Sequence, residues 1–129
     1  MANKIVRQAN VVILGVTFKE NTPDTRNSKV VDIIDSLREY GIEPIVVDPE
    51  ADVDEAKQEY GLELVDIKEV KDADCLVLAV AHDTFKQLSW EDVDSLYGNF
   101  DNNEKILIDV KSMLDRNELV QRGYSYWRL

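Results

Sequence analysis

Four mainly apolar runs, separated by polar or amphipathic stretches, constrain this chain more than any other feature. The runs are VVILGV (11–16), PIVVD (44–48), CLVLAVA (75–81) and KILIDV (105–110). Short apolar runs rich in β-branched residues are typical of strands covered on both faces. The stretch between the first two runs has apolar residues at helical spacing from Val30 to Leu37. This alternation predicts an α/β domain built from right-handed crossovers.

Two weaker segments extend the predicted sheet. Residues 62–65 predict a short edge strand, and the ending YSYWRL (124–129) predicts a terminal strand or tail. The sequence therefore predicts a Rossmann-like three-layer sandwich with a mostly parallel sheet of five or six strands. Counted along the chain, the expected order is 3-2-1-4-5, with 11–16 beside 75–81. The 129 residues fit a single domain spanning 1–129.

Polar residues predict where the helices begin. Asn27 or Ser28 can cap the helix that follows the first strand. Asp52, with Glu55 three residues later, has the pattern of a capping box. Ser89 can cap a second helical piece that begins at Trp90.

The strand order also predicts the position of a ligand. In open α/β sheets, ligands bind beyond the carboxyl ends of the strands, at the point where the strand order reverses. The residues just past three neighbouring strands are Phe18-Lys19, His82-Asp83 and Lys111-Ser112. We therefore expect two lysines and the only histidine of the chain to approach one crevice.

The turn after the first strand does not have the pattern of a dinucleotide site. Such a site needs Gly-x-Gly-x-x-Gly, and here Gly15 stands alone. Asp48 ends the second strand, where the ribose-binding acid lies in such folds. Without the glycines, we interpret Asp48-Pro49 as a turn.

Two other polar residues have open alternatives. Arg26 either contacts Asp24 and shapes the loop, or belongs to a binding site. His82 either orients a ligand, or caps the next helix and packs at the end of its strand.

Composition excludes several classes of function. The formal net charge of −11 opposes a nucleic-acid surface, and no apolar run approaches the ~20 residues of a membrane span. The single cysteine, Cys75, excludes an internal disulfide and suits the cytoplasm. It opens a buried strand, and because apolar burial makes a thiol inert, we expect no nucleophilic role. We expect no metal site, because no second histidine or cysteine lies near His82 in the sequence.

The segment GVTFKENTPDTRNSKVVDIIDSLREYGIEPIVVDP resembles the start of the C-terminal domain of the UDP-glucose/GDP-mannose dehydrogenase family. The residues that carry the resemblance are Gly15, Thr17, Phe18, Lys19, Asp24, Arg26, Ser28, Asp48 and Pro49. AVAHDTFKQL and the final YWRL resemble the branch acting on UDP-N-acetylhexosamines, such as UDP-N-acetyl-D-mannosamine or UDP-N-acetyl-D-galactosamine. The resemblance covers nearly the whole chain.

The resemblance implies an NAD-dependent oxidation of a sugar C6 alcohol to a carboxylate, for surface polysaccharide synthesis. It implies that NAD is bound by an N-terminal domain of a longer parent, which this sequence lacks, and that this fragment holds no cofactor and is inactive alone. The family's nucleophilic cysteine belongs to a central domain, and Cys75 does not match its motif. Parents of this kind are dimers or larger, so the expected partners are the UDP-sugar and the remaining domains.

The resemblance also assigns roles to site residues. Phe18 and Lys19 are expected on the diphosphate side of the cleft. Lys111 matches a basic position that faces the ligand, although the family often has glycine and arginine where this chain has Val110-Lys111. Arg26 matches a family arginine for which we expect a structural or hinge-like role. Two other functions stay open: a non-enzymatic interaction module and a self-sufficient NAD-binding protein.

Overall fold

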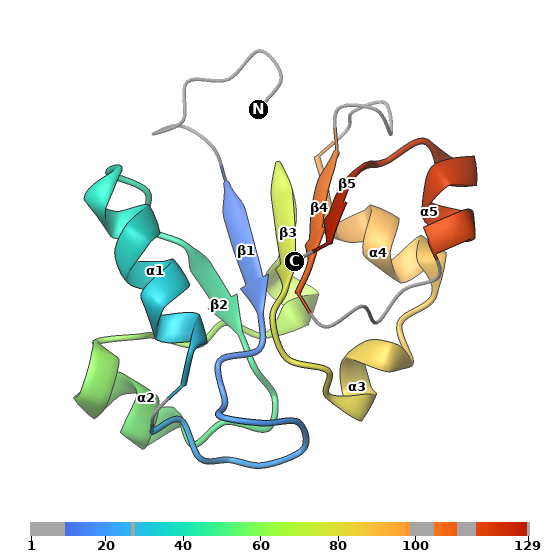
Figure 1. Cartoon of the computed structure of the whole chain (residues 1–129). Helices are drawn as coiled ribbons and strands as arrows, with labels where there is room; N and C mark the ends of the chain where they lie inside the picture. Colours follow the sequence, from blue (N-terminus) through green and yellow to red (C-terminus); the bar gives the residue numbers. More distant parts are fainter. Residues whose placement is uncertain (1–9, 27, 99–104, 111–115, 129) are drawn as a thin grey trace.

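The computed structural model describes residues 10–26, 28–98, 105–110 and 116–128. Within these ranges the chain forms a five-stranded, all-parallel sheet with the order β2-β1-β3-β4-β5 (Figure 1). The strands are β1 (Val11–Leu14), β2 (Ile45–Val47), β3 (Cys75–Leu78), β4 (Ile106–Asp109) and β5 (Ser125–Arg128). All four long apolar runs therefore supply strands, in the predicted spatial order, and the terminal segment adds a fifth.

The predicted edge strand at 62–65 is wrong. Leu64 makes only an isolated parallel bridge to Val46, so the order 3-2-1-4-5 becomes 2-1-3-4-5 in the numbering of the observed strands. The chain leaves the sheet edge because the Asp66 side chain accepts a hydrogen bond from the Lys68 amide. This bond starts the short 3₁₀ helix η2 (Ile67–Glu69), which cannot continue the strand ladder.

Helices cover both faces of the sheet, which confirms the three layers. Helices α1 (Val30–Glu39) and α2 (Val53–Tyr60) lie on one face, and α3 (Asp83–Lys86), α4 (Trp90–Leu96) and α5 (Arg116–Arg122) lie on the other. Alternate strand residues point to opposite cores. Ile13, for example, packs in the cluster that contains Ile34 of α1, whereas Leu14 packs in the cluster that contains Phe85 of α3.

The helix starts agree with the sequence in part. The Ser28 hydroxyl accepts a hydrogen bond from the Val30 amide, and Asn27 lies outside the described residues. Asp52 caps α2, and Ser89 forms a capping box at α4. The Glu55 carboxylate accepts hydrogen bonds from Thr25.

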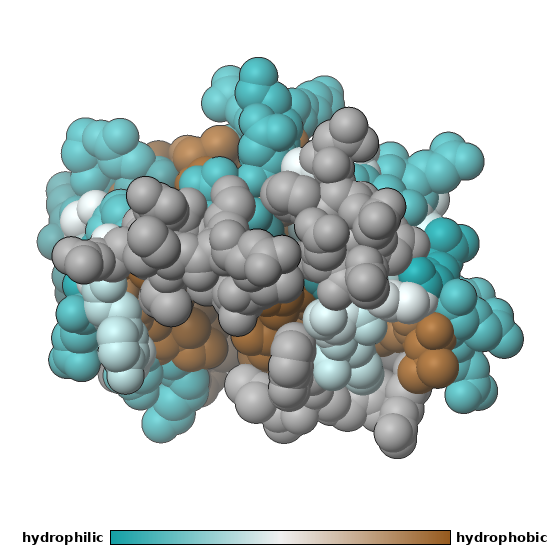
Figure 2. All heavy atoms as spheres, turned by 90° about the horizontal axis from the view of Figure 1, so that it is seen from above, coloured by the Kyte–Doolittle hydropathy of each residue, from teal (hydrophilic) through white to brown (hydrophobic). Residues whose placement is uncertain are grey.

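The loops that follow β1, β2 and β3 gather at the carboxyl ends of the strands, at the bottom of Figure 1. Figure 2 views the opposite edge, where hydrophilic residues surround a few visible hydrophobic ones. Among the described residues, no helix is long and apolar enough to cross a membrane.

Candidate functional site

The loop after β1, residues 16–26, forms one side of the candidate site and is called the lip loop here. Gly15 directly precedes the lip loop, has a φ of 103° and donates its amide to the Val47 carbonyl at 2.8 Å. Phe18 donates its amide back to the Asp24 carbonyl at 2.8 Å, which closes the loop on itself. The lip loop is thus an ordered turn rather than an open glycine-rich one.

Asp48 anchors this loop from the end of β2. Its Oδ2 accepts hydrogen bonds from the amides of Val16 at 2.7 Å and Thr17 at 3.3 Å. Its Oδ1 accepts from the amides of Glu50 at 2.9 Å and Ala51 at 3.0 Å. Burial alone raises the pKa of a carboxyl group, but hydrogen bonds from His82 and the backbone outweigh it, so the pKa of Asp48 is lowered. Asp48 therefore stabilises the turn that the sequence predicted at Asp48-Pro49.

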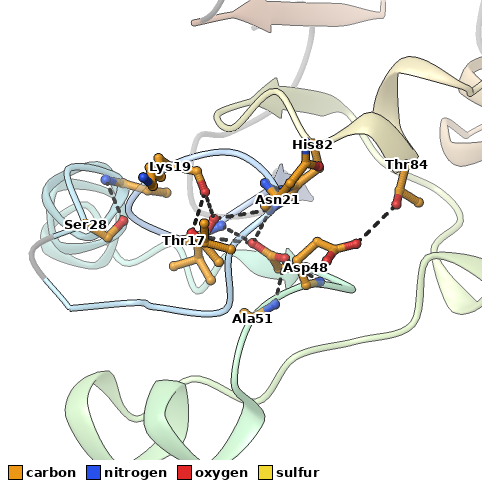
Figure 3. Close-up of polar contacts among 12 residues, drawn as sticks. Thr17, Lys19, Asn21, Ser28, Asp48, Ala51, His82 and Thr84 are labelled. Carbon is orange, nitrogen blue, oxygen red and sulfur yellow. Dashed lines mark hydrogen bonds and ion pairs between the residues drawn. The ribbon is translucent and has the colours of Figure 1, made fainter.

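His82 completes a buried network under the lip loop (Figure 3). Its Nδ1 accepts a hydrogen bond from the Asn21 amide at 2.8 Å, so Nδ1 carries no proton. The proton is on Nε2, which lies 2.9 Å from Oδ2 of Asp48 and 3.2 Å from Oγ1 of Thr17. The His82 side chain has no exposed surface. The ring consequently contacts the loop that carries Lys19 rather than a solvent-filled cleft.

Lys19 and Phe18 are both exposed on the lip loop, and Phe18 is 56% exposed. They line a pocket of about 130 Å³ with Lys29 and the first turn of α1. Hydroxyl groups of Thr17 and Thr22 donate to the Lys19 carbonyl at 2.8 and 3.0 Å, which fixes the backbone at this residue. In Figure 3, Lys19 and Ser28 lie on the side of the network toward α1. The charged residues that line the pocket are the two lysines and one acid, Glu20, so cations outnumber acids, and Phe18 adds one exposed aromatic ring.

Lys111 lies outside the described residues, so its predicted place at this site stays a prediction. The residue before it, Val110, lines the same pocket as Lys19 and donates its amide to the Leu78 carbonyl at 3.0 Å. The end of β4 therefore reaches the pocket, as the strand order predicted.

Arg26 does not line this pocket. Its guanidinium lies 3.1 Å from the Asp24 carboxylate, and its side chain is 67% exposed. Hydrogen bonds between the two side chains lower the pKa of Asp24 and raise that of Arg26. The observed geometry is the local contact, one of the two alternatives given by the sequence.

A larger pocket of about 300 Å³ opens on the other side of Asp48, between β2 and α3. Its lining is mostly apolar, and its charged members are the acids Asp48 and Asp66. A phosphate is repelled by these charges, so this pocket does not suit an anionic ligand.

The residues at the end of β1 do not fit a dinucleotide. Both oxygens of Asp48 are occupied by chain amides and His82, which leaves no acceptor for a ribose. Gly15 lies against Val80, and the lip loop offers no second glycine for a close approach of a pyrophosphate. Among the described residues, no group of acids, histidine and cysteine could hold a metal ion.

Sequence reasoning missed Lys29 and the Asp48–His82 contact. Lys29 immediately precedes α1, where the sequence places only a capping residue. Asp48 and His82 follow the two strands that flank β1, so the strand order brings both to the carboxyl ends of the strands, on either side of β1. From this placement, a contact between the two side chains could have been predicted.

Comparisons with known proteins show the family of the chain. A profile described as "UDP-glucose/GDP-mannose dehydrogenase family, UDP binding domain" matches residues 12–116. Protein CapL of Staphylococcus aureus is 41% identical over 96% of this chain and 28% of its own length. A UDP-N-acetyl-D-glucosamine 6-dehydrogenase of Pseudomonas aeruginosa is 41% identical over 85% of this chain and 25% of its own.

Solved structures show the same fold. That of the UDP-D-ManNAc dehydrogenase from Pyrococcus horikoshii superposes with a TM-score of 0.74 and 26% identity, covering 98% of this chain and 27% of that one. The chain therefore spans about a quarter of the length of the proteins it matches. Because the family profile covers most of the chain, the protein belongs to the UDP-glucose/GDP-mannose dehydrogenase family and contains its UDP-binding domain.

Proposed function

We propose that residues 1–129 form the nucleotide-sugar-binding domain of an NAD-dependent UDP-N-acetylhexosamine 6-dehydrogenase. The diphosphate of the substrate lies at the pocket lined by Phe18, Lys19 and Lys29. Lys111 supplies a further cation from the end of β4. The observation that carries the proposal is the exposed Lys19 on a lip loop with a fixed backbone, in a domain of the UDP-binding family.

Two lysines suit a diphosphate for a simple electrostatic reason. Ammonium groups donate charge-assisted hydrogen bonds to phosphate oxygens and act as mobile point charges. Their field is local, so it is compatible with a formal net charge of −11 for the whole chain. Phe18 presents an exposed ring beside Lys19, which suits contact with an apolar face of the nucleotide sugar.

The reaction that we propose for the longer parent is oxidation of the sugar C6 alcohol to a uronate for surface polysaccharide synthesis. This oxidation removes two hydrides from C6, for which NAD bound elsewhere in the parent would be the acceptor, and water would supply the second carboxylate oxygen. NAD is held by an N-terminal domain outside this chain, because the end of β1 does not fit a dinucleotide. We place the parent in the cytoplasm as a homodimer or larger assembly.

The test is a titration of the 129-residue chain with UDP and with UDP-N-acetylhexosamines, followed by backbone amide shifts. We expect shifts at residues 17–20 and 29–33 for each UDP compound and none for NAD. The N-acetylmannosamine, N-acetylgalactosamine and N-acetylglucosamine derivatives, compared in parallel, distinguish the sugar epimers. Affinity is expected to be weak, because other domains of the parent supply part of the site.

The matched variants are Lys19→Ala and Lys71→Ala. Both lysines are exposed, but Lys71 precedes β3 and so lies toward the opposite edge of the sheet. Loss of one charge-assisted contact costs about 1.5–3 kcal/mol, so Lys19→Ala should raise the Kd for UDP roughly 10- to 150-fold. Lys71→Ala should leave it unchanged. Equal effects of the two variants, or no response to UDP at all, contradict the proposal and favour an interaction module.

A further inference from the structure

The single histidine of the chain contacts the lip loop on both sides of Lys19. His82 Nδ1 accepts a hydrogen bond from the Asn21 amide at 2.8 Å, and Nε2 lies 3.2 Å from Thr17 Oγ1. Thr17 and Asn21 are the second residues before and after Lys19 in the sequence. One buried ring therefore fixes both flanks of the residue that we place against the diphosphate (Figure 3).

The ring is also held from the end of β2. Asp48 accepts from Nε2 at 2.9 Å, and both side chains have no exposed surface. The same carboxylate receives amides from the lip loop and from the turn after β2. The position of the ring is therefore coupled to the ends of β1, β2 and β3 at once.

Asn21 gives this contact a particular geometry. Its φ of 58° is left-handed, a region that asparagine adopts more readily than most residues. In this conformation the backbone N–H of Asn21 donates to His82, while its side-chain Oδ1 accepts a hydrogen bond from the Asp83 backbone N–H at 2.9 Å. The backbone and the side chain of Asn21 thus both join the lip loop to the start of α3.

We propose that His82 is a positioning residue of the nucleotide-sugar site. It sets Lys19 against the diphosphate by holding Asn21 and Thr17, and it does not touch the ligand. This inference rests on the proposed function of the pocket. If loss of the Nδ1 contact leaves the lip loop in its binding position about one tenth of the time, the apparent Kd for UDP rises roughly 10-fold.

Three variants separate positioning from general stability. His82→Gln places its amide toward Asp48 but leaves the Asn21 amide without its acceptor. His82→Asn is the reverse, since its shorter side chain keeps an oxygen near the Nδ1 position. Phe85→Leu is the control for lost stability, because the Phe85 ring is buried 5.4 Å from the His82 ring without a polar contact.

We expect His82→Gln to weaken UDP binding roughly 10-fold, His82→Asn to restore most of it, and Phe85→Leu to leave it unchanged. If His82 acts through Lys19, His82→Gln should have little further effect in a Lys19→Ala background. An undiminished effect of His82→Gln in that background, or an equal effect of Phe85→Leu, overturns the inference.

A spectroscopic measurement tests the geometry without any ligand. Because the chain has one histidine, its ring nitrogens are assigned without ambiguity by long-range proton–nitrogen correlation. We expect an unprotonated Nδ1 and a protonated Nε2, and the opposite tautomer overturns the inference. If the wild-type chain fails to bind UDP, the proposed function fails. Amide exchange of residues 18–22 then decides whether His82 holds the lip loop: it must rise more in His82→Gln than in Phe85→Leu.

Discussion

Gly15 lies so close to Val80 that a Cβ atom added to residue 15 would be 2.5 Å from the Val80 Cβ. Real Cβ atoms do not approach at this distance, and the φ of Gly15, 103°, is also one that other residues rarely adopt. The contact joins the end of β1 to the segment that follows β3. Close packing against Val80 thus explains why residue 15 is a glycine.

Gly15→Ala should therefore destabilise the fold by about 2–4 kcal/mol, the sum of backbone strain and overpacking. Gly123→Ala is the control, because Gly123 has a φ of 79° but nothing within 4 Å of an added Cβ. Its cost should be only the conformational one, about 1–2 kcal/mol. Urea unfolding of the two variants measures the difference, and equal losses would falsify the steric argument.

Ionised Asp48 should make stability depend on pH in the acid range. The pKa of this carboxyl is lowered from its ordinary value of 3.8 in the folded state, so its contribution is present above pH 3.8. The contribution is lost as the pH falls through the folded-state pKa, since protonation removes an acceptor. Unfolding free energy measured from pH 6 downward should fall most steeply below 3.8.

Asp48→Asn should remove much of this dependence and lower stability at neutral pH by about 2–4 kcal/mol. The new amide group would face donors from Val16 and Thr17 at the position of an acceptor. Asp54→Asn, on the exposed first turn of α2, is the matched control and should leave the pH profile unchanged. A wild-type profile retained in Asp48→Asn contradicts the assignment.

The sequence predicted the sheet well because the central strands are covered on both faces, which leaves long apolar runs. The prediction of a strand at 62–65 failed, because this segment makes only one bridge and its sequence has no clear strand pattern. The chain then turns at Asp66. At the site, Val110 lines the pocket of Lys19, and the expected place of Lys111 beside them stays a prediction. Strand order could have indicated the Asp48–His82 pair, but the contact of His82 with the lip loop was not predictable, because it depends on the left-handed Asn21.

Glu55 shows how tertiary contacts override a local motif. The sequence indicated a capping box with Asp52, but Glu55 Oε1 instead accepts the amide and hydroxyl of Thr25 at 2.7 and 2.8 Å. Thr25 has no exposed surface, so Glu55→Ala should cost about 2–3 kcal/mol by leaving buried donors unpaired. Glu55→Gln keeps the acceptor and should cost less in thermal unfolding. Similar losses in both variants would contradict the role of the Glu55 side-chain oxygen as the acceptor for Thr25.

Cys75 should be unreactive while the chain is folded. Burial, with a smaller contribution from the charge of Asp74, raises the pKa of its thiol to about 12. The thiolate is the reactive form, and the side chain is only 3% exposed. A disulfide reagent at pH 8 should therefore label the denatured chain at once and the native chain only at the rate of unfolding. Rapid labelling of native protein contradicts the burial of this strand.

Lys29 should contribute to UDP binding less than Lys19 does. Both line the pocket, but Lys19 lies on the lip loop, whose backbone is fixed by Thr17 and Thr22. Within the part of the chain that the structure describes, no side-chain hydrogen bond or ion pair orients Lys29. A lysine that acts mainly through a screened field loses its effect in salt. Lys29→Ala should therefore weaken UDP binding a few-fold at low ionic strength and hardly at all at ~0.5 M salt. The loss in Lys19→Ala should persist at high salt, because a direct contact is screened less than a distant one, and parallel titrations at the two salt concentrations distinguish the roles.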